Sequence, residues 1–218
     1  MGSLGPVSSA WGSQRRRLTI VLALNAALIV GLVLVGFAAN SVSVLAAAGD
    51  TVGDCFGLTL GLIAIAVRDR NPDHPNAQRP IALAALINSC LLSIVMLSVV
   101  AESVGRLTAG SPPVSGLPVV VVGAVMVVVM LAGAAVLGRS AAGEDIHMRS
   151  VLLDAIADAA AAAGVAIGGA VILVSGGLYW VDPVLALAIS VVVAVAAIRL
   201  GLTAITALRG APVDFGDD

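Results

Sequence analysis

Long apolar runs, separated by short polar segments, dominate the chain. Six of them reach roughly 20 residues or more, and each is bounded by charge, Pro or Gly: Leu18 to Phe37, Val42 to Val67, Ile81 to Val104, Leu117 to Leu137, Met148 to Val174 and Pro183 to Leu208. An α-helix needs about 20 apolar residues to cross the hydrocarbon core of a bilayer. The pattern therefore predicts an all-α integral membrane protein with six transmembrane helices.

These runs occupy almost the whole chain. We expect a short cytoplasmic tail over residues 1–16, a six-helix membrane domain over 17–212 and a short tail over 213–218, with no cytoplasmic C-terminal domain. The first run follows three Arg, as a signal peptide would, but it exceeds the 7 to 15 residues of a signal-peptide core and predicts a retained helix. We expect the protein to contact the lipid bilayer and to bind no nucleic acid. A homodimer, if it forms, is expected to pair through the membrane helices.

Arginine distribution gives the orientation. The chain has 11 Arg and no Lys, and with a cytoplasmic N-terminus only Arg106 lies on the outer side. The positive-inside rule therefore predicts that both termini are cytoplasmic, with the plasma (inner) membrane as the expected location. Tyr179 and Trp180, between the last two runs, suit the outer headgroup zone as interfacial anchors.

Two pairs of aspartates lie inside these apolar runs. Asp50 and Asp54 are in the second run, and Asp154 and Asp158 are in the fifth. An ionised carboxylate at the centre of a membrane helix costs at least about 2.5 to 3.5 kcal/mol, so four of them need a compensating partner. A divalent cation is the simplest partner.

The spacing within each pair supports this interpretation. Residues four apart stand one above the other on a helix, so each pair presents two carboxylates on one face. Two facing helices would then offer four oxygen donors, enough for tetrahedral coordination of a first-row divalent ion. From the run boundaries the pairs differ in depth by roughly 10 to 15 Å, which helix tilt could close.

Small residues flank both aspartate faces. Gly49, Gly53, Gly57 and Gly61 repeat every four residues in the second run, and Ala160, Gly164 and Gly168 do so in the fifth. Such spacing lets helix backbones approach closely in lipid. The ridge either brings a partner helix to the site or reflects general tight packing. Both interpretations place the aspartates inside the protein, away from lipid.

The segments SVSVLAAAGDTVGD, HPNAQRPIALAALIN, HMRSVLLDAIADAAAAAGV and VDPVLALAISVVVAVAAIRL resemble the cation diffusion facilitator, or cation efflux, transporters. The resemblance covers roughly residues 17 to 212. It implies a transporter rather than an enzyme, which exports Zn²⁺ or a related divalent ion from the cytoplasm in exchange for protons. It also implies that Asp50, Asp54, Asp154 and Asp158 bind the transported ion, with no prosthetic group.

Three differences from the family pattern affect the expectation. Many zinc-selective members have His at the position of Asp154, and an oxygen-only ligand set favours Mn²⁺, Fe²⁺ or Co²⁺ relative to Zn²⁺. Relatives commonly continue into a cytoplasmic metal-binding domain that supports dimerisation, whereas this chain stops at Asp218. The segment GRSAAGEDIHMR also lacks the histidine-rich tract of some relatives.

Two other function classes can be weighed. An intramembrane aspartyl protease is disfavoured, because the segment Ala47 to Asp50 does not match its GxGD signature and because that chemistry needs one Asp on each helix. A non-transporting metal-binding scaffold, or a partner subunit of a full-length exporter, remains the alternative.

The remaining polar residues carry weaker expectations. Asn25 and Asn88 are expected to hydrogen-bond between helices, and Cys55 and Cys90 to serve as packing residues without the spacing of a redox or metal site. Glu102 and Asp182 are expected to cap helix ends. His74, His147 and the acidic residues Asp69, Asp73, Glu144 and Asp145 are expected to be solvated loop residues.

Overall fold

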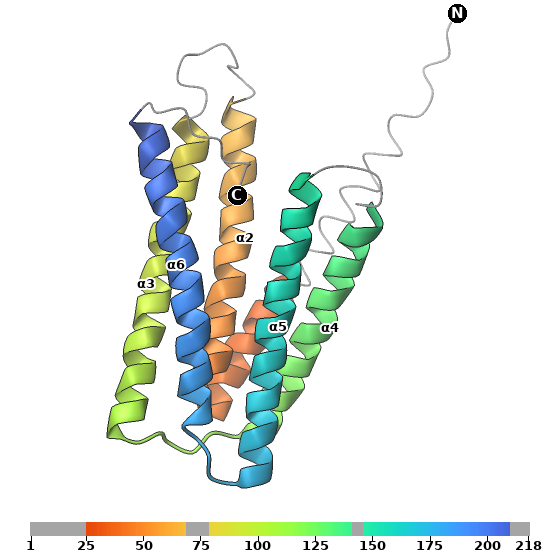
Figure 1. Cartoon of the computed structure of the whole chain (residues 1–218), viewed down its shortest axis with the longest axis vertical. Helices are drawn as coiled ribbons and strands as arrows, with labels where there is room; N and C mark the ends of the chain where they lie inside the picture. Colours follow the sequence, from red (N-terminus) through yellow and green to blue (C-terminus); the bar gives the residue numbers. More distant parts are fainter. Residues whose placement is uncertain (1–24, 69–78, 141–145, 210–218) are drawn as a thin grey trace, which may run out of the picture.

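Helices that follow one another up and down build the whole described part of the protein. The computed structural model describes residues 25–68, 79–140 and 146–209, and its description of side chains excludes residues 65, 68, 133–140 and 146–155. The helices are a first helix (Asn25–Ala39), α2 (Val42–Arg68), α3 (Arg79–Ala109), α4 (Gly116–Ser140), α5 (Ile146–Ser175) and α6 (Val181–Leu208). The predicted all-α bundle of six helices is confirmed over these residues (Figure 1).

The helix ends follow local chemistry. Pro80, Pro118 and Pro183 lie in the first turns of α3, α4 and α6, where a missing backbone N–H leaves no hydrogen bond unmade. At the other ends, Gly110 follows α3 with φ of 99° and Gly176 follows α5 with φ of 65°. Glycine adopts this left-handed conformation without steric cost, so it ends the helices sharply.

Apolar length agrees with a membrane location. Within the described residues, α3, the segment Ile156–Ser175 and α6 are long and apolar enough to cross a membrane, and the first helix and Gly116–Ala132 form shorter apolar stretches. The 27-residue α2 carries two aspartates and four glycines among its apolar residues. Many large apolar side chains point outward, including Leu62, Ile94 and Val192, as lipid contact requires.

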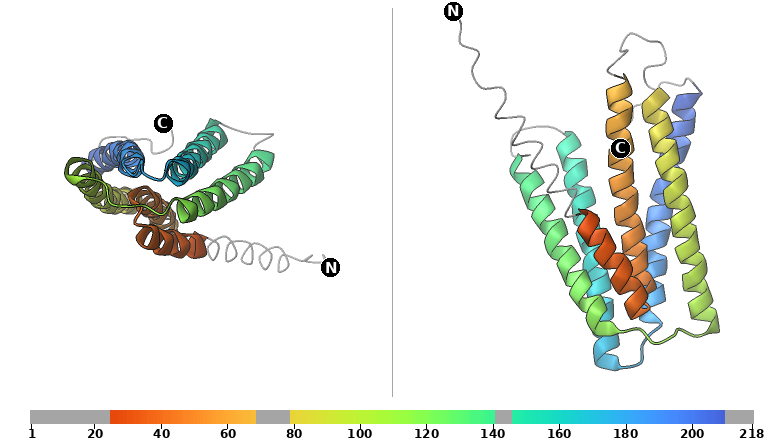
Figure 2. Two further views of the ribbon diagram at one scale, coloured as in Figure 1. Left: turned by 90° about the horizontal axis from the view of Figure 1, so that it is seen from below. Right: turned by 180° about the vertical axis from the view of Figure 1, so that it is seen from behind.

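The helices form two groups. α3 packs against α6 along most of its length, and α2 lies against both of them, while α4 packs mainly against α5. α5 contacts α6 less extensively and touches α2 over only a short stretch. Figure 2 shows the first helix beside α2 and α4, so it lies between the two groups.

Small residues allow the close helix contacts. The buried positions of α6 beyond its first turn are all small: Ala186, Ser190, Ala194, Ala197, Gly201 and Ala204. In the α4–α5 pair, a Cβ on Gly123 would lie 2.8 Å from the backbone nitrogen of Ala166, and one on Gly169 would lie 2.8 Å from that of Val120. These two backbones are therefore in direct contact, as small residues permit in membrane helices.

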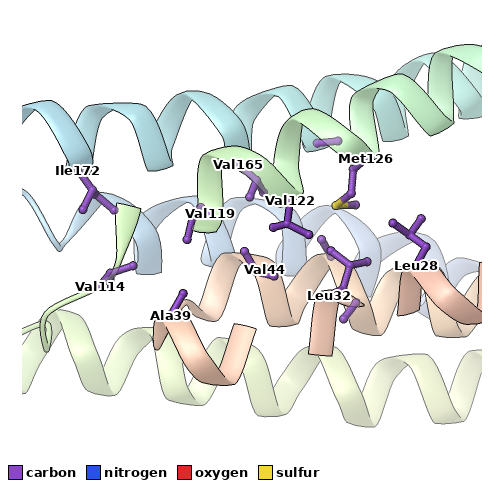
Figure 3. Packing of buried hydrophobic residues seen from close by; sticks show 13 residues of the cluster. Leu28, Leu32, Ala39, Val44, Val114, Val119, Val122, Met126, Val165 and Ile172 are labelled. Carbon is purple, nitrogen blue, oxygen red and sulfur yellow. The ribbon is translucent and has the colours of Figure 1, made fainter. Parts of the chain in front are cut away.

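The two ends of the bundle differ in packing. The Asn40 end holds the turn at Asn40 and the connections 110–115 and 176–180, and the Arg79 end holds the start of α3 and the end of α6. The largest buried apolar cluster extends from the Asn40 end toward the middle of the bundle (Figure 3). Its members come from the first helix, α2, α4 and α5 and the segment before α4, and include Leu32, Val44, Val119, Val165 and Ile172. Among the side chains that the structure describes, the two helix groups are thus joined chiefly in this half.

Candidate metal centre

The first aspartate pair lies in the middle of α2, where the sequence predicts it. Asp50 is half-buried and Asp54, one turn closer to the Arg79 end, is exposed. The described residues do not bury Asp54, and enclosure of all four aspartates stays a prediction, because the side chains of residues 146–155 of α5 lie outside the described part of the chain.

The second pair lies in α5. Asp158 is half-buried, and its carboxylate is close enough to Asp50 to interact with it electrostatically, as Asp54 does on the same helix. The structure therefore brings one aspartate of α5 to the aspartate pair of α2. Asp154 lies four residues earlier in α5, and its side chain falls outside the described residues.

The described carboxylates do not by themselves complete a coordination shell. Across the side chains that the structure describes, no three of His, Cys, Asp and Glu are grouped closely enough to hold a metal ion together. Electrostatic interaction between charges reaches well beyond the roughly 2 Å that separates a carboxylate oxygen from a bound first-row ion. The structure shows acidic faces that approach each other, and the four-aspartate site stays a prediction.

The surroundings of the aspartates differ toward the two ends. On the Asn40 side, Val44, Ala47 and Ala48 of α2 belong to the buried apolar cluster, and Ala162 and Val165 of α5 do as well. On the Arg79 side, α2 has exposed positions, with side chains such as Leu58 and Leu62 on its surface. The aspartates thus border a buried apolar cluster on the Asn40 side, and described apolar side chains of α2 lie on the surface on the Arg79 side.

The glycine ridge of α2 contacts α3. A Cβ on Gly49 would lie 2.7 Å from Val95, one on Gly53 would lie 2.6 Å from Leu92, and one on Gly57 would lie 2.7 Å from Asn88. Gly61 has open space around it. Close packing by the ridge is confirmed, but its partner is α3 and not the helix that carries the second aspartate pair. The ridge and the aspartates are adjacent faces of α2, so the packing of the ridge on α3 contributes to the orientation of the acidic face.

Glycines on the fifth helix face its other neighbours. A Cβ on Gly168 would collide with Leu185 of α6, whereas Gly164 has open space. The small face of α5 therefore does not form a contact surface for α2.

Asn88 has an unusual environment. Its side-chain oxygen is buried and accepts no hydrogen bond within the described residues, although its amide nitrogen packs against Gly57. The predicted interhelical hydrogen bond from this side chain is not observed.

Both cysteines are free thiols, with Cys55 half-buried and Cys90 exposed.

Asp182 is expected from the sequence to cap the start of its own helix, α6, but it caps the start of α2. It is only 1% exposed, and it lies in the first turn of α6, where the N-cap position is Trp180 with no side-chain cap. Its carboxylate instead accepts hydrogen bonds from Ser41, Val42 and Ser43 at the start of α2. A serine-flanked helix start at Ser41 was visible in the sequence, but nothing in the sequence states which carboxylate meets it.

Glu102 also does not cap a helix. It accepts a hydrogen bond from Arg106 at 2.8 Å, an ion pair between residues four apart in α3. A negative charge near a helix C-terminus is unfavourable, and the neighbouring guanidinium offsets it.

The aromatic pair lies at the Asn40 end, which is the predicted outer side. Trp180 is exposed, and Tyr179 is half-buried and donates a hydrogen bond to the carbonyl of Gly176. Neither residue lies near the aspartates along the bundle, which agrees with a position at the membrane interface.

The expected loop residues His74, Asp69, Asp73, Glu144 and Asp145 lie outside the described residues, as does the side chain of His147. The same holds for residues 1–24 and 210–218, so the predicted tails and the first part of the first predicted span stay predictions.

Comparison with known proteins agrees with the fold. The family model for the cation efflux transmembrane domain matches residues 18–208. No curated protein is similar enough to the whole chain to match it. Since the family match extends over almost all of the chain and the described helices are apolar, this is an integral membrane protein that belongs to the cation efflux family, whose members transport metal cations.

Proposed function

We propose that this protein carries a first-row divalent cation across the membrane through a site formed by Asp50, Asp54, Asp154 and Asp158. The observation that carries the proposal is the approach of Asp158 on α5 to Asp50 on α2 in a cation efflux domain. Facing carboxylates in an apolar bundle repel one another unless a cation or protons neutralise them. A transported cation provides that charge.

The donor set favours a hard or borderline ion. All four proposed ligands are carboxylates, which suit Mn²⁺, Fe²⁺ and Co²⁺, and which Zn²⁺ also accepts. We therefore infer transport of Mn²⁺, Fe²⁺, Co²⁺ or Zn²⁺, with the oxygen-only set shifting preference away from Zn²⁺.

Access to the site follows from the packing of the two ends. The buried apolar cluster lies between the aspartates and the Asn40 end. Arginine distribution predicts that the Arg79 end is cytoplasmic. We therefore infer that the ion enters the site from the cytoplasmic end, and that export requires the apolar cluster to part.

Proton exchange follows from the same charges. An empty, ionised site would hold up to four negative charges in a region of low dielectric constant, which opposes any rearrangement that buries it further. Loading with either a cation or protons removes this obstacle. We therefore infer that the cation leaves the cytoplasm in exchange for protons that move inward.

Transport by the purified protein in vesicles tests the proposal. Cation flux should depend on an imposed pH gradient, and Asp54→Asn and Asp158→Asn should each abolish it by removing a ligand charge. Glu102→Gln is the matched control, because Glu102 is an exposed acid outside the site and its amide should leave flux intact. Flux that is indifferent to the pH gradient would refute antiport.

The same assay separates transport from a scaffold function. One possible outcome is that the unmutated protein binds the cation but carries none under any gradient, and that Asp54→Asn loses this binding. This combination would favour the metal-binding scaffold or partner subunit. Absence of binding in the unmutated protein would refute the site itself.

A further inference from the structure

The most deeply buried charged side chain in the described part of the chain takes no part in the proposed site. Asp182 is 1% exposed and lies at the Asn40 end, in the first turn of α6. Burying an ionised carboxylate is costly unless strong hydrogen bonds replace its hydration. The groups that contact Asp182 therefore indicate which part of the fold its buried carboxylate stabilises.

Both oxygens of the Asp182 carboxylate are used by the start of α2. Oδ1 accepts from Ser41 Oγ at 2.6 Å and from Ser43 Oγ at 2.5 Å, with a longer bond from Ser43 N at 3.4 Å. Oδ2 accepts from Val42 N at 2.6 Å. The first N–H groups of a helix have no partner within the helix, and their partial positive charge favours a carboxylate.

Ser41 links this contact to the helix itself. Its Oγ donates to Asp182 and also accepts from Val44 N at 3.2 Å, as an N-cap residue does. Asp182 and Ser41 together satisfy the free amides of the first turn of α2. The start of α2 is thus fastened to the start of α6 across 141 residues of sequence.

A second contact holds the residue just before this turn. Arg106 of α3 donates to the carbonyl of Asn40 at 2.6 Å and to its side-chain oxygen at 3.0 Å. Three helices therefore meet at the start of α2 through polar contacts, and the position of that start is specified at the Asn40 end.

The start of α2 determines where its aspartates lie. Val42 and Asp50 are eight residues apart in one uninterrupted helix, which corresponds to about 12 Å and just over two turns. A slip of α2 by one residue would rotate its acidic face by about 100°. Because α5 touches α2 only over a short stretch, the facing of Asp50 toward Asp158 depends on how α2 is held elsewhere.

We propose that Asp182 is a positioning residue for the cation site, which sets the depth and rotation of Asp50 and Asp54 by fixing the start of α2 to α6. This inference rests on the proposed function. Asp182 binds no cation in this role, since all the groups that contact its oxygens are donors. An amide at this position would turn an N–H₂ group toward donors and break the arrangement.

Cation affinity tests the inference. In nanodiscs, the full chain with Asp182→Asn should bind Mn²⁺ about tenfold or more weakly than the unmutated chain, since hydrogen bonds to a charged group are lost. Ser43→Ala, which removes one of these bonds, should weaken binding less. Val114→Ala is the matched control, because it opens a buried position at the same end without contacting Asp182.

Two results would overturn the inference. One is Mn²⁺ affinity in Asp182→Asn equal to that of the unmutated chain. The other is an equal loss of affinity in Asp182→Asn and Val114→Ala at matched loss of thermal stability, which would show general destabilisation. If Asp182→Asn does not fold, the same comparison is made between Ser43→Ala and Val114→Ala.

Hydrogen exchange in metal-free protein distinguishes this inference from the proposed function. Amides of Val42, Ser43 and Val44 should exchange faster in Ser43→Ala and Asp182→Asn than in Val114→Ala. Unchanged exchange there refutes the fastening of α2 whatever the protein transports. If the unmutated chain binds no Mn²⁺, Zn²⁺ or Co²⁺, the proposed function fails, and the positioning role for a cation site fails with it even where exchange responds.

Discussion

At the scale of single residues, Asn40 shows how one backbone conformation specifies the turn before α2. It is the only described non-glycine residue with positive φ, at 56°. Asparagine tolerates this left-handed region better than other side chains with a Cβ. Its side chain also accepts from Arg106 and donates to the carbonyl of Pro113 at 3.4 Å. The residue therefore serves both the turn and the contact to α3.

Substitution of Asn40 should separate these two roles. Asn40→Gly keeps the favourable backbone and loses the side-chain hydrogen bonds, so we expect destabilisation of about 1 kcal/mol. Asn40→Ala loses both and should cost about 1 to 2 kcal/mol more. Thermal unfolding in detergent measures the difference, and equal stability of the two variants would show that the left-handed backbone is not strained.

Asp154 carries the expected selectivity of the site. Replacing one carboxylate with an imidazole makes the donor set softer, so Asp154→His should shift preference from Mn²⁺ toward Zn²⁺. Competition of the two ions for binding to the purified protein measures the shift, with Glu102→Gln as the variant that should not change it. An unchanged ratio in Asp154→His would place the selectivity elsewhere.

At the scale of helices, glycines allow particular pairs of helices to pack closely. The α4–α5 pair is joined by backbone contact at Gly123 and Gly169, and α2 is joined to α3 at Gly49, Gly53 and Gly57. The α4–α5 interface tolerates no added side chain, because the neighbouring atoms there include backbone atoms, whereas the α2 glycines meet side chains of α3.

Gly123→Ala should force α4 and α5 apart. Its Cβ would lie within 2.9 Å of the backbone nitrogen and Cα of Ala166, so we expect a cost of about 1 to 3 kcal/mol. Gly164→Ala is the control on the same helix pair, because its Cβ has open space, and the better helix propensity should stabilise the protein by about 0.5 to 1 kcal/mol. Chemical denaturation in mixed micelles compares the two, and similar effects would argue against backbone contact at Gly123.

At the scale of the whole molecule, packing is unequal between the two ends. The buried cluster that joins the helix groups lies in the half toward the Asn40 end, and exposed positions of α2 such as Leu58, Leu62 and Ile63 lie toward the Arg79 end. Because the apolar cluster lies between the aspartates and the Asn40 end, we expect the ion to reach the aspartates from the Arg79 end.

Native Cys55, directly after Asp54, reports on this asymmetry. In a Cys90→Ser background, a membrane-impermeant thiol reagent should label Cys55 when added on the Arg79 side of sealed vesicles and not when added on the Asn40 side. The Cys55→Ser, Cys90→Ser double variant gives the background signal. Labelling only from the Asn40 side would reverse the assignment of the open end, and protection by bound Mn²⁺ would support a cation beside Asp54.

The sequence determined the parts of this protein that depend on local composition. The number of helices and the apolar class follow from run length, and the observed bounds differ from the predicted ones by five residues or fewer where both are described, because polar ends extend helices beyond their apolar cores. The pairing of aspartates on each helix follows from the helical period alone. These features need no knowledge of the neighbours.

Only the tertiary structure decided which surfaces meet. A row of glycines predicts close packing, but it suits any helix with a small or flat face. The sequence therefore did not reveal that the glycines of α2 pack against α3 and not against α5. A buried aspartate predicts donors but not their location, so the contact between Asp182 and α2 could not be inferred. Helix contacts depend on complementary shape between segments far apart in the chain, and no local pattern encodes that relation.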